Sequence, residues 1–285
     1  MEYDKILSAK FKDLNAVADE YSKPYKENLP FPHISINNFF DENFLKKVLQ
    51  EFPNLSAKKK SESWNNKNEV KFLNNSYETF GPYTRFCVDF LNSKIYLNFL
   101  QTITSIKEKL ISDPYLSGGG LHEIKKGGLL KVHTDFNKHP SLNLDRRINV
   151  LIYLNENWKE DYGGNLELWD QKMENCIKKI SPEFNKMVIF STTDFSNHGH
   201  PNLLKCPNNM SRKSIALYYF SDGRPENEIF NKHLKNRTNF KSRLGVKNDA
   251  DEQKEYFKNY IRKFKIYNWM KDFEKKYIRK GKKKK

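Results

Sequence analysis

A histidine and an aspartate stand one residue apart in the stretch KVHTDFNKHP, residues 131–140. The chain has only seven histidines among 285 residues, so the presence of His133 and His139 in one short stretch is unusual. Residues i and i+2 of a β-strand point to the same face. If LLKVHTDF ends as a strand, His133 and Asp135 can therefore direct an imidazole and a carboxylate at one centre.

A metal site would need a further ligand, because two side chains do not fix a catalytic metal. The stretch STTDFSNHGHP follows the apolar run KMVIF and offers His198 and His200. Two histidines and one carboxylate form the facial triad of non-haem Fe(II) oxygenases, which leaves three positions of an octahedral ion open. We predict that His133, Asp135 and His198 bind Fe(2+), with His200 as the alternative to His198.

An arginine follows on the next apolar segment, SRKSIALYYF, residues 211–220. Many oxygenases of this chemical type use 2-oxoglutarate, which carries a carboxylate far from the metal. A guanidinium group binds a carboxylate through two parallel hydrogen bonds. Arg212 is therefore predicted to anchor the co-substrate.

The surrounding sequence predicts the elements that must position these residues. We expect a helical lead-in over residues 1–29, a strand after Pro32, a helix that Asp41 caps, and a long loop over residues 54–76. One or two helices are expected within residues 83–111. Six or seven short apolar runs between residues 116 and 221, separated by Gly, Pro and Asn, indicate a β-sandwich or jelly roll.

Composition limits the remaining classes of protein. The net charge is +16, but residues 253–285 contain 14 basic and 3 acidic residues, so the basic character belongs mainly to the C-terminal tail. The three cysteines, Cys87, Cys176 and Cys206, form no CxxC pair and predict neither a disulfide framework nor a thiolate zinc site. We expect no signal peptide, no transmembrane segment and a cytoplasmic location.

From about residue 118 to residue 221 the chain resembles the Fe(II)- and 2-oxoglutarate-dependent oxygenases, specifically the prolyl 4-hydroxylase-like branch. The motifs that carry the resemblance occur in order: GGLLKVHTDFN, RRINVLIYLNENW, YGGNLELWD, SPEFNKMVIFSTTDFSNHGHP and RKSIALYYF. The resemblance implies an α+β fold with a double-stranded β-helix (jelly-roll) core, and the sequence pattern adds flanking N-terminal helices and a basic C-terminal helical extension. The predicted ranges are 1–29 for the lead-in, 30–224 for the oxygenase domain, with its core at about 116–221, and 225–285 for the extension.

The resemblance also assigns roles to individual residues. It implies that His133, Asp135 and His198 are the iron ligands, and that Arg212 and Tyr153 bind the distal carboxylate of 2-oxoglutarate. The reaction would consume 2-oxoglutarate and O2, release succinate and CO2, and hydroxylate a substrate, with L-ascorbate as a further possible cofactor. Tyr153 as an ordinary core aromatic is the alternative.

Several polar residues have two interpretations. Thr134 or Asn137 could hydrogen-bond the carboxylate of Asp135. Arg146 and Arg147 are expected to make salt bridges or anchor a loop, with binding of an acidic substrate or cofactor as the alternative. His139 is expected in a loop, with contact to a substrate as the alternative, and His122 is expected to be an ordinary strand residue, with a place in the pocket lining as the alternative.

Three functions remain open at this point. The leading hypothesis is a hydroxylase that acts on a prolyl residue of a protein or peptide. The alternatives are a hydroxylase of a small molecule, such as a free amino acid or a sugar nucleotide, and a non-catalytic binding protein on a jelly roll. The basic tail could pack on the domain or could contact nucleic acid, the ribosome or an anionic membrane.

Overall fold

Thirteen β-strands and four α-helices make up the part of the chain that the structure, a computed structural model, describes: residues 2–57, 61–228, 236–243 and 246. All of these elements lie in one unit, Met1–Phe240, and residues 241–285 are a second unit. Most of the basic helical extension expected over residues 225–285 lies outside the described residues. The predicted boundary after residue 224 stays a prediction.

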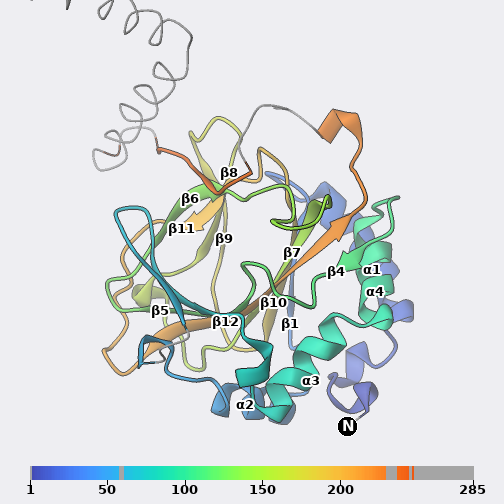
Figure 1. Cartoon of the computed structure of the whole chain (residues 1–285), viewed down its shortest axis with the longest axis horizontal. Coiled ribbons are helices and arrows are strands. Elements are labelled where there is room, and N and C mark those ends of the chain that lie inside the picture. The colour runs from blue at the N-terminus through green and yellow to red at the C-terminus, as the bar shows by residue number, and fades with distance from the viewer. Residues whose placement is uncertain (1, 58–60, 229–235, 244–245, 247–285) are drawn as a thin grey trace, which may run out of the picture. The chain divides into compact units, whose positions relative to one another are not determined.

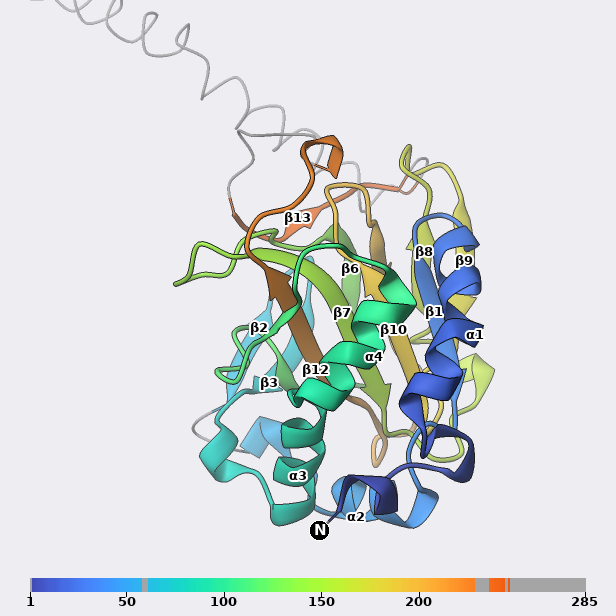
Figure 2. The same ribbon diagram turned by 90° about the vertical axis from the view of Figure 1, so that its right-hand side faces the viewer.

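The helices precede most of the strands in the sequence. They are α1 (Leu14–Glu27), α2 (Glu42–Gln50), α3 (Pro82–Leu91) and α4 (Lys94–Thr104). The carboxylate of Asp41 accepts a hydrogen bond from the amide of Phe44 and caps α2, as predicted. Figure 2 shows α1 and α4 lying across one face of a sheet, with α2 and α3 near one end.

All strand pairs are antiparallel, and they form two sheets (Figure 1). The larger sheet has the order β1 (His33–Asn37), β10 (Lys186–Ser191), β7 (Asp145–Tyr153), β12 (Ser211–Ser221), β5 (Gly120–Lys125), β3 (Val70–Asn74), β2 (Glu62–Asn65), and β4 (Ile111–Ser112) pairs with β12. The smaller sheet has the order β13 (Asn239–Phe240), β6 (Leu130–Thr134), β11 (His198–His200), β8 (Leu166–Trp169), β9 (Cys176–Ile180). The predicted α+β jelly roll is confirmed.

The larger sheet is buried on both faces. Because successive side chains of a strand point to opposite faces, residues of the hydrophobic core alternate with residues that face the site. On β7, Val150 and Ile152 belong to the core that the helices cover, whereas Leu151 and Tyr153 belong to the core between the two sheets. The same alternation places Ile215 and Leu217 of β12 on the helix side. Polar residues at the intervening positions of these two strands therefore face the smaller sheet.

The predicted loop over residues 54–76 is wrong, because the structure forms a hairpin there. β2 pairs with β3, and β3 pairs with β5 at the edge of the larger sheet. Only Leu73 and Asn74 of β3 are fully buried, and no residue of β2 is. An edge strand needs few apolar residues, so the Lys-, Asn- and Ser-rich sequence concealed it.

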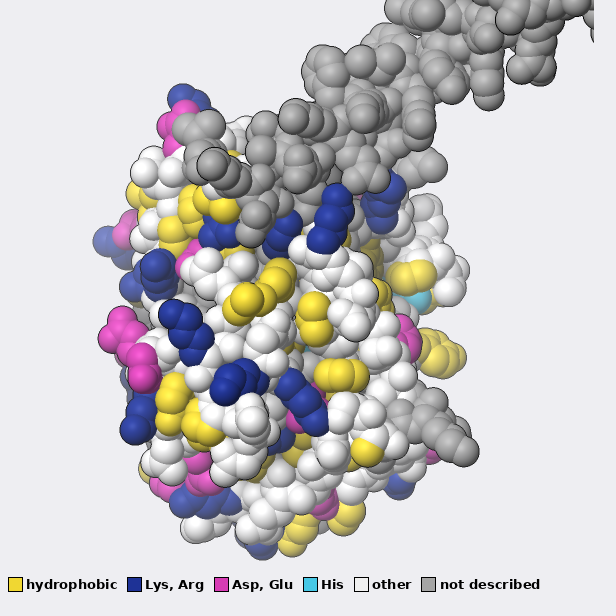
Figure 3. All heavy atoms as spheres, turned by 90° about the vertical axis from the view of Figure 1, so that its left-hand side faces the viewer, with side chains coloured by type: hydrophobic (Ala, Val, Ile, Leu, Met, Phe, Trp, Pro, Cys, Tyr) yellow, Lys and Arg dark blue, Asp and Glu magenta, His cyan; other side chains and the backbone are white. Residues whose placement is uncertain are grey.

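Two observations bear on contact with a membrane or with an anionic partner. None of the helices in the described ranges is long and apolar enough to cross a bilayer. On the coloured part of the face drawn in Figure 3, lysine and arginine side chains are scattered among neutral ones and do not merge into one patch. The coloured part of this face therefore shows no basic patch comparable to the run of basic residues in the C-terminal sequence.

Candidate functional site

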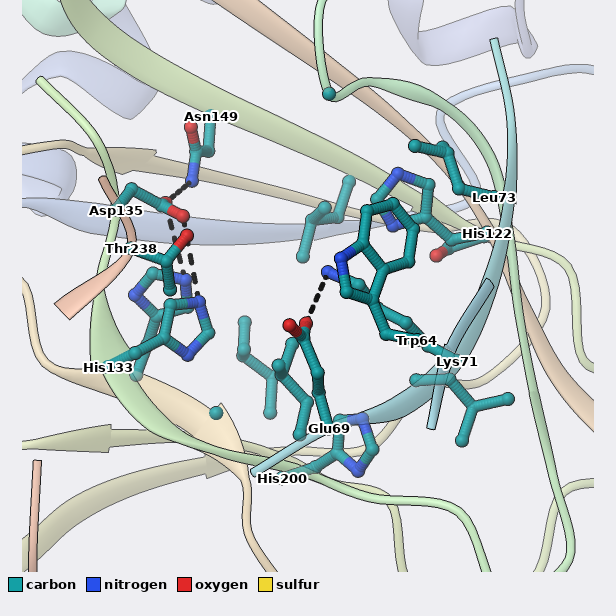
Figure 4. Close-up of a pocket in the computed structure, with 18 of the residues that line it drawn as sticks. Trp64, Glu69, Lys71, Leu73, His122, His133, Asp135, Asn149, His200 and Thr238 are labelled. Carbon is teal, nitrogen blue, oxygen red and sulfur yellow. Dashed lines mark hydrogen bonds and ion pairs between the residues drawn. The ribbon is translucent and has the colours of Figure 1, made fainter. Parts of the chain in front are cut away.

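His133, Asp135 and His198 come together where two strands of the smaller sheet pair. His133 lies on β6, Asp135 follows the last residue of that strand, and His198 begins β11 directly opposite His133. One ligand atom from each of the three side chains lies within 4.8 Å of the others. Figure 4 shows the carboxylate of Asp135 reaching toward the histidine rings. The structure thus brings together the three residues that the sequence proposed as ligands, and His200 stays outside the cluster.

Backbone carbonyls fix the tautomers of the two histidines. Nδ1 of His133 lies 2.8 Å from the carbonyl oxygen of Lys131, and Nδ1 of His198 lies 2.8 Å from that of Ser196. A carbonyl oxygen only accepts, so each Nδ1 carries the hydrogen and each Nε2 has a free lone pair. These Nε2 atoms lie 3.6 Å and 3.5 Å from the two oxygens of Asp135. Two imidazole nitrogens and a carboxylate are a donor set that suits Fe(II).

The carboxylate of Asp135 has two donors that the sequence did not identify. Its Oδ2 atom accepts from Nη2 of Arg146 at 3.1 Å and from Nδ2 of Asn149 at 2.7 Å. The prediction that Asn137 hydrogen-bonds Asp135 is wrong, since the Asn137 amide donates to Asp194. Among the described residues, Thr134 makes no hydrogen bond to the Asp135 carboxylate either. Burial alone would raise the pKa of Asp135, but the positive charge of Arg146 and the facing histidines hold it well below its usual value. The group is therefore an anion ready to bind a cation.

Arg146 is held tightly beneath the triad. It is 1% exposed, and its guanidinium carbon lies 3.4 Å from the ring centre of Tyr218 and 4.4 Å from that of Phe136. Nε and Nη2 both donate to Oδ1 of Asn149. Nη1 has no hydrogen-bond partner among the described residues, and Arg146 lines the pocket. A buried donor is thus left available to a ligand.

Salt bridges occur as predicted for both arginines of the pair. Arg147 contacts Glu108 at 2.8 Å and Glu228 at 3.2 Å, away from the triad. Arg146 pairs with Asp135 itself. The salt bridge of Arg146 therefore acts on a proposed metal ligand, whereas that of Arg147 ties β7 to the segment that follows β12.

A pocket of about 190 Å³ joins the triad to Arg212. Nη2 of Arg212 donates to the hydroxyl of Tyr153 at 3.0 Å, and Nε donates to the carbonyl of Gly164 at 2.8 Å. Gly164 has a φ of +76°, and a Cβ there would lie 3.1 Å from Cδ of Arg212, so the close approach of the arginine needs glycine. The two residues predicted to bind one carboxylate are therefore adjacent.

The β2–β3 hairpin supplies a charged wall that the sequence did not predict (Figure 4). Nζ of Lys71 lies 3.0 Å from the carboxylate of Glu69 and 4.7 Å from the ring centre of Trp64. Thr238, just before β13, lines the same pocket near His133. Phe240 of β13 lies 5.6 Å from the His133 ring, measured between ring centres. No sequence pattern indicated a strand here.

His139 and His122 lie in different surroundings. His139 takes the loop role expected of it: its Nδ1 accepts from the amides of Ser141 and Leu142, and its Nε2 lies 3.1 Å from the hydroxyl of Ser117. His122 lies on β5 and lines the pocket.

Buried histidines make the stability of the metal-free protein depend on pH. Burial lowers the pKa of His33 and His200, and lowers that of His198 to about 4. The unfolded chain binds protons near pH 6.5, whereas the folded protein does not, so the free energy of unfolding should fall as the pH drops from 6.5 toward 4. Each histidine contributes up to about 1.4 kcal/mol per pH unit. Urea titrations in EDTA at several pH values test this, and a stability that is flat over the range would contradict it.

Comparison with known proteins agrees with this geometry. Residues 119–220 match the sequence model of the 2OG-Fe(II) oxygenase superfamily. Over 79 residues, 26% of this chain, the sequence is 32% identical to Prolyl 3-hydroxylase OGFOD1 of Mus musculus, but the match spans only 14% of that protein's length.

Two solved structures show the same fold. One is a prolyl hydroxylase from Trichoplax adhaerens in complex with a hypoxia inducible factor peptide fragment, with a TM-score of 0.56, 19% identity, and coverage of 77% of this chain and 96% of that one. The other comes from work on prolyl 4-hydroxylases from Phytophthora capsici, with a TM-score of 0.52, 19% identity, and coverage of 87% and 74%. At such identities the likeness supports the jelly-roll fold alone.

Proposed function

We propose that the protein is a dioxygenase that hydroxylates its substrate and consumes 2-oxoglutarate. Residues 119–220 match the sequence model of the 2OG-Fe(II) oxygenase superfamily, which supports this proposal. The observation that carries the proposal is the presence, in one pocket, of the His133–Asp135–His198 triad and the Arg212–Tyr153 pair. The first would hold the metal and the second the co-substrate. A binding protein without catalysis would not need both.

Each group has a defined task in this reaction. His133, Asp135 and His198 would hold the metal, and a set of three protein ligands would leave coordination positions for 2-oxoglutarate and O2. Arg212 and the hydroxyl of Tyr153 would bind the distal carboxylate and so fix the orientation of the co-substrate. Bound Fe(II) would supply the redox chemistry that couples decarboxylation of 2-oxoglutarate to oxygen transfer. In the balanced reaction one oxygen atom of O2 would enter succinate and the other the hydroxylated product, and CO2 would be released.

The substrate that we propose is a prolyl residue of a protein or peptide. The relatives support this, because the mouse protein and both solved structures are named as prolyl hydroxylases. The free Nη1 donor of Arg146 supports it as well, since a peptide carbonyl is an acceptor that this buried donor could bind.

The direct test measures succinate release by the full chain from 2-oxoglutarate with Fe(II), O2 and ascorbate. We expect turnover that rises when a proline-containing peptide is added, and a peptide mass increased by one oxygen atom. Succinate release without any peptide product, together with oxidation of a free amino acid or a sugar nucleotide, would replace the prolyl substrate by a small molecule. Absence of succinate under all these conditions would overturn the proposed activity.

A further inference from the structure

His200 is a buried histidine whose ring has no hydrogen-bond partner among the described residues. Its exposed fraction is 3%, and neither Nδ1 nor Nε2 makes a hydrogen bond to a described residue. A buried polar group that lacks a partner destabilises a folded protein. A hydrophobic side chain would fill the same position at lower cost, so the imidazole is suited to a partner that enters the pocket.

The ring of His200 lies in the pocket and outside the metal cluster. His200 ends β11 and pairs with Leu130 of β6, which also bridges to Glu69 of the hairpin region. Figure 4 shows His200 on the side of the pocket where Glu69 and Lys71 lie, away from Asp135. It therefore faces the part of the pocket that a ligand would occupy beyond the metal.

The charges around His200 identify the kind of ligand. A neutral imidazole offers one N–H donor and one acceptor nitrogen, and neither nitrogen of His200 has a hydrogen-bond partner among the described residues. Arg212 and Lys71 line the same pocket as His200, and Lys71 is already paired with Glu69 at 3.0 Å. Arg212 has no carboxylate partner among the described residues and bonds only to neutral oxygens of Tyr153 and Gly164. A carboxylate accepts hydrogen bonds from both a guanidinium and an imidazole N–H, so a carboxylate ligand in this pocket would satisfy both groups.

We propose that His200 is a binding residue for 2-oxoglutarate, donating a hydrogen bond to the distal carboxylate that Arg212 and Tyr153 also bind. The inference rests on the proposed function and adds a residue to its co-substrate site. An ionised carboxylate offers about four lone-pair sites, so a fork from Arg212 and a hydroxyl from Tyr153 leave one site for His200.

The test is a calorimetric titration of the full chain, loaded with Mn(II) under argon so that no turnover occurs. His200→Leu should raise the Kd for 2-oxoglutarate about tenfold or more, since a hydrogen bond to a charged group is lost. His200→Gln, which keeps a donor, should stay within about threefold of the wild type. The affinity for 2-oxobutyrate, which has the metal-binding end but no distal carboxylate, should be the same in all three proteins.

The outcomes separate the inference from the proposed function. If the wild type binds 2-oxoglutarate and His200→Leu binds it equally well, the role of His200 is overturned and the dioxygenase stands. Equal losses for 2-oxoglutarate and 2-oxobutyrate would also overturn it, because the effect would then lie at the metal end. If the wild type binds neither compound, the proposed function itself fails.

Thermal unfolding without ligand or metal gives a second, independent measurement. His200→Leu removes an unpartnered polar group and should raise the Tm by about 2–4 °C. The matched control is His33→Leu, because His33 is equally buried but its Nδ1 lies 2.8 Å from the carbonyl of Phe31. That variant should lower the Tm and leave 2-oxoglutarate affinity unchanged. A lower Tm for His200→Leu would show that the ring already has a partner and would contradict the inference.

Discussion

Replacing His133 with alanine is expected to abolish metal binding and, with it, the release of succinate from 2-oxoglutarate. The variant leaves one imidazole and one carboxylate, which cannot hold one face of an octahedral ion. Loss of a group that only supports a metal ligand weakens binding about 10- to 100-fold, so loss of a ligand should exceed a hundredfold. Titration of the metal-free chain with Co(II), followed by visible absorption, measures this without turnover.

The matched control for this variant is His139→Asn, six residues further along the same segment. Asparagine places an acceptor where Nδ1 of His139 accepts from the amides of Ser141 and Leu142, so the loop should persist. Metal affinity and succinate release should then match those of the wild type. Retention of Co(II) affinity by His133→Ala would remove His133 from the metal site.

The first two members of the triad could be proposed from sequence because their geometry follows from strand periodicity, whereas Tyr153 was proposed from the family resemblance alone. His133 and Asp135 are two residues apart at the end of a strand, and a shared face follows from that spacing alone. His198 required a further step, because its place opposite His133 depends on which strands pair. The order of apolar runs and the family resemblance supplied that step, whereas local sequence could not.

Arg146 shows where periodicity fails. Strict alternation along β7 would place it with Ile148 on the helix side of the larger sheet. The pairing of β7 with β12 shifts register between Tyr219 and Phe220, and Arg146 pairs with Phe220. Such a bulge reverses the faces of the residues beyond it, so Arg146 turns toward Asp135. A sequence does not reveal a bulge that depends on the partner strand.

The pocket wall was missed for a different reason. Trp64 and Lys71 lie on strands with little buried apolar surface, and Thr238 precedes a strand of only two residues. These segments are held by pairing with strands that are already in place: β3 with β5, and β13 with β6. Their conformation therefore depends on the assembled fold, and their sequences carry no hydrophobic period from which a strand could be predicted.

Replacing Arg146 with methionine is expected to destabilise the metal-free protein by about 3–5 kcal/mol, because it leaves Asp135 as a buried charge without a cation. Arg146 is fully buried, so solvent does not screen the loss. Asn149 remains as a donor to the carboxylate, but it carries no charge. Urea denaturation of the wild type and variant, both in EDTA, measures the difference. Arg146→Lys should fall between them, since lysine keeps the charge but cannot bridge Asp135 and Asn149 or stack on Tyr218 in the same way.

Two further measurements, one with added metal and one with a second substitution, identify why Arg146→Met loses stability. Mn(II) should stabilise Arg146→Met more than it stabilises the wild type, because a bound cation takes over the neutralisation of Asp135. Asp135→Asn, which removes the charge, should make the effect of Arg146→Met much smaller than it is in the wild-type background. If the two substitutions were simply additive, the loss would come from packing of the guanidinium against Tyr218 and Phe136. In that case the Arg146–Asp135 salt bridge would not be the interaction that positions Asp135 for the metal.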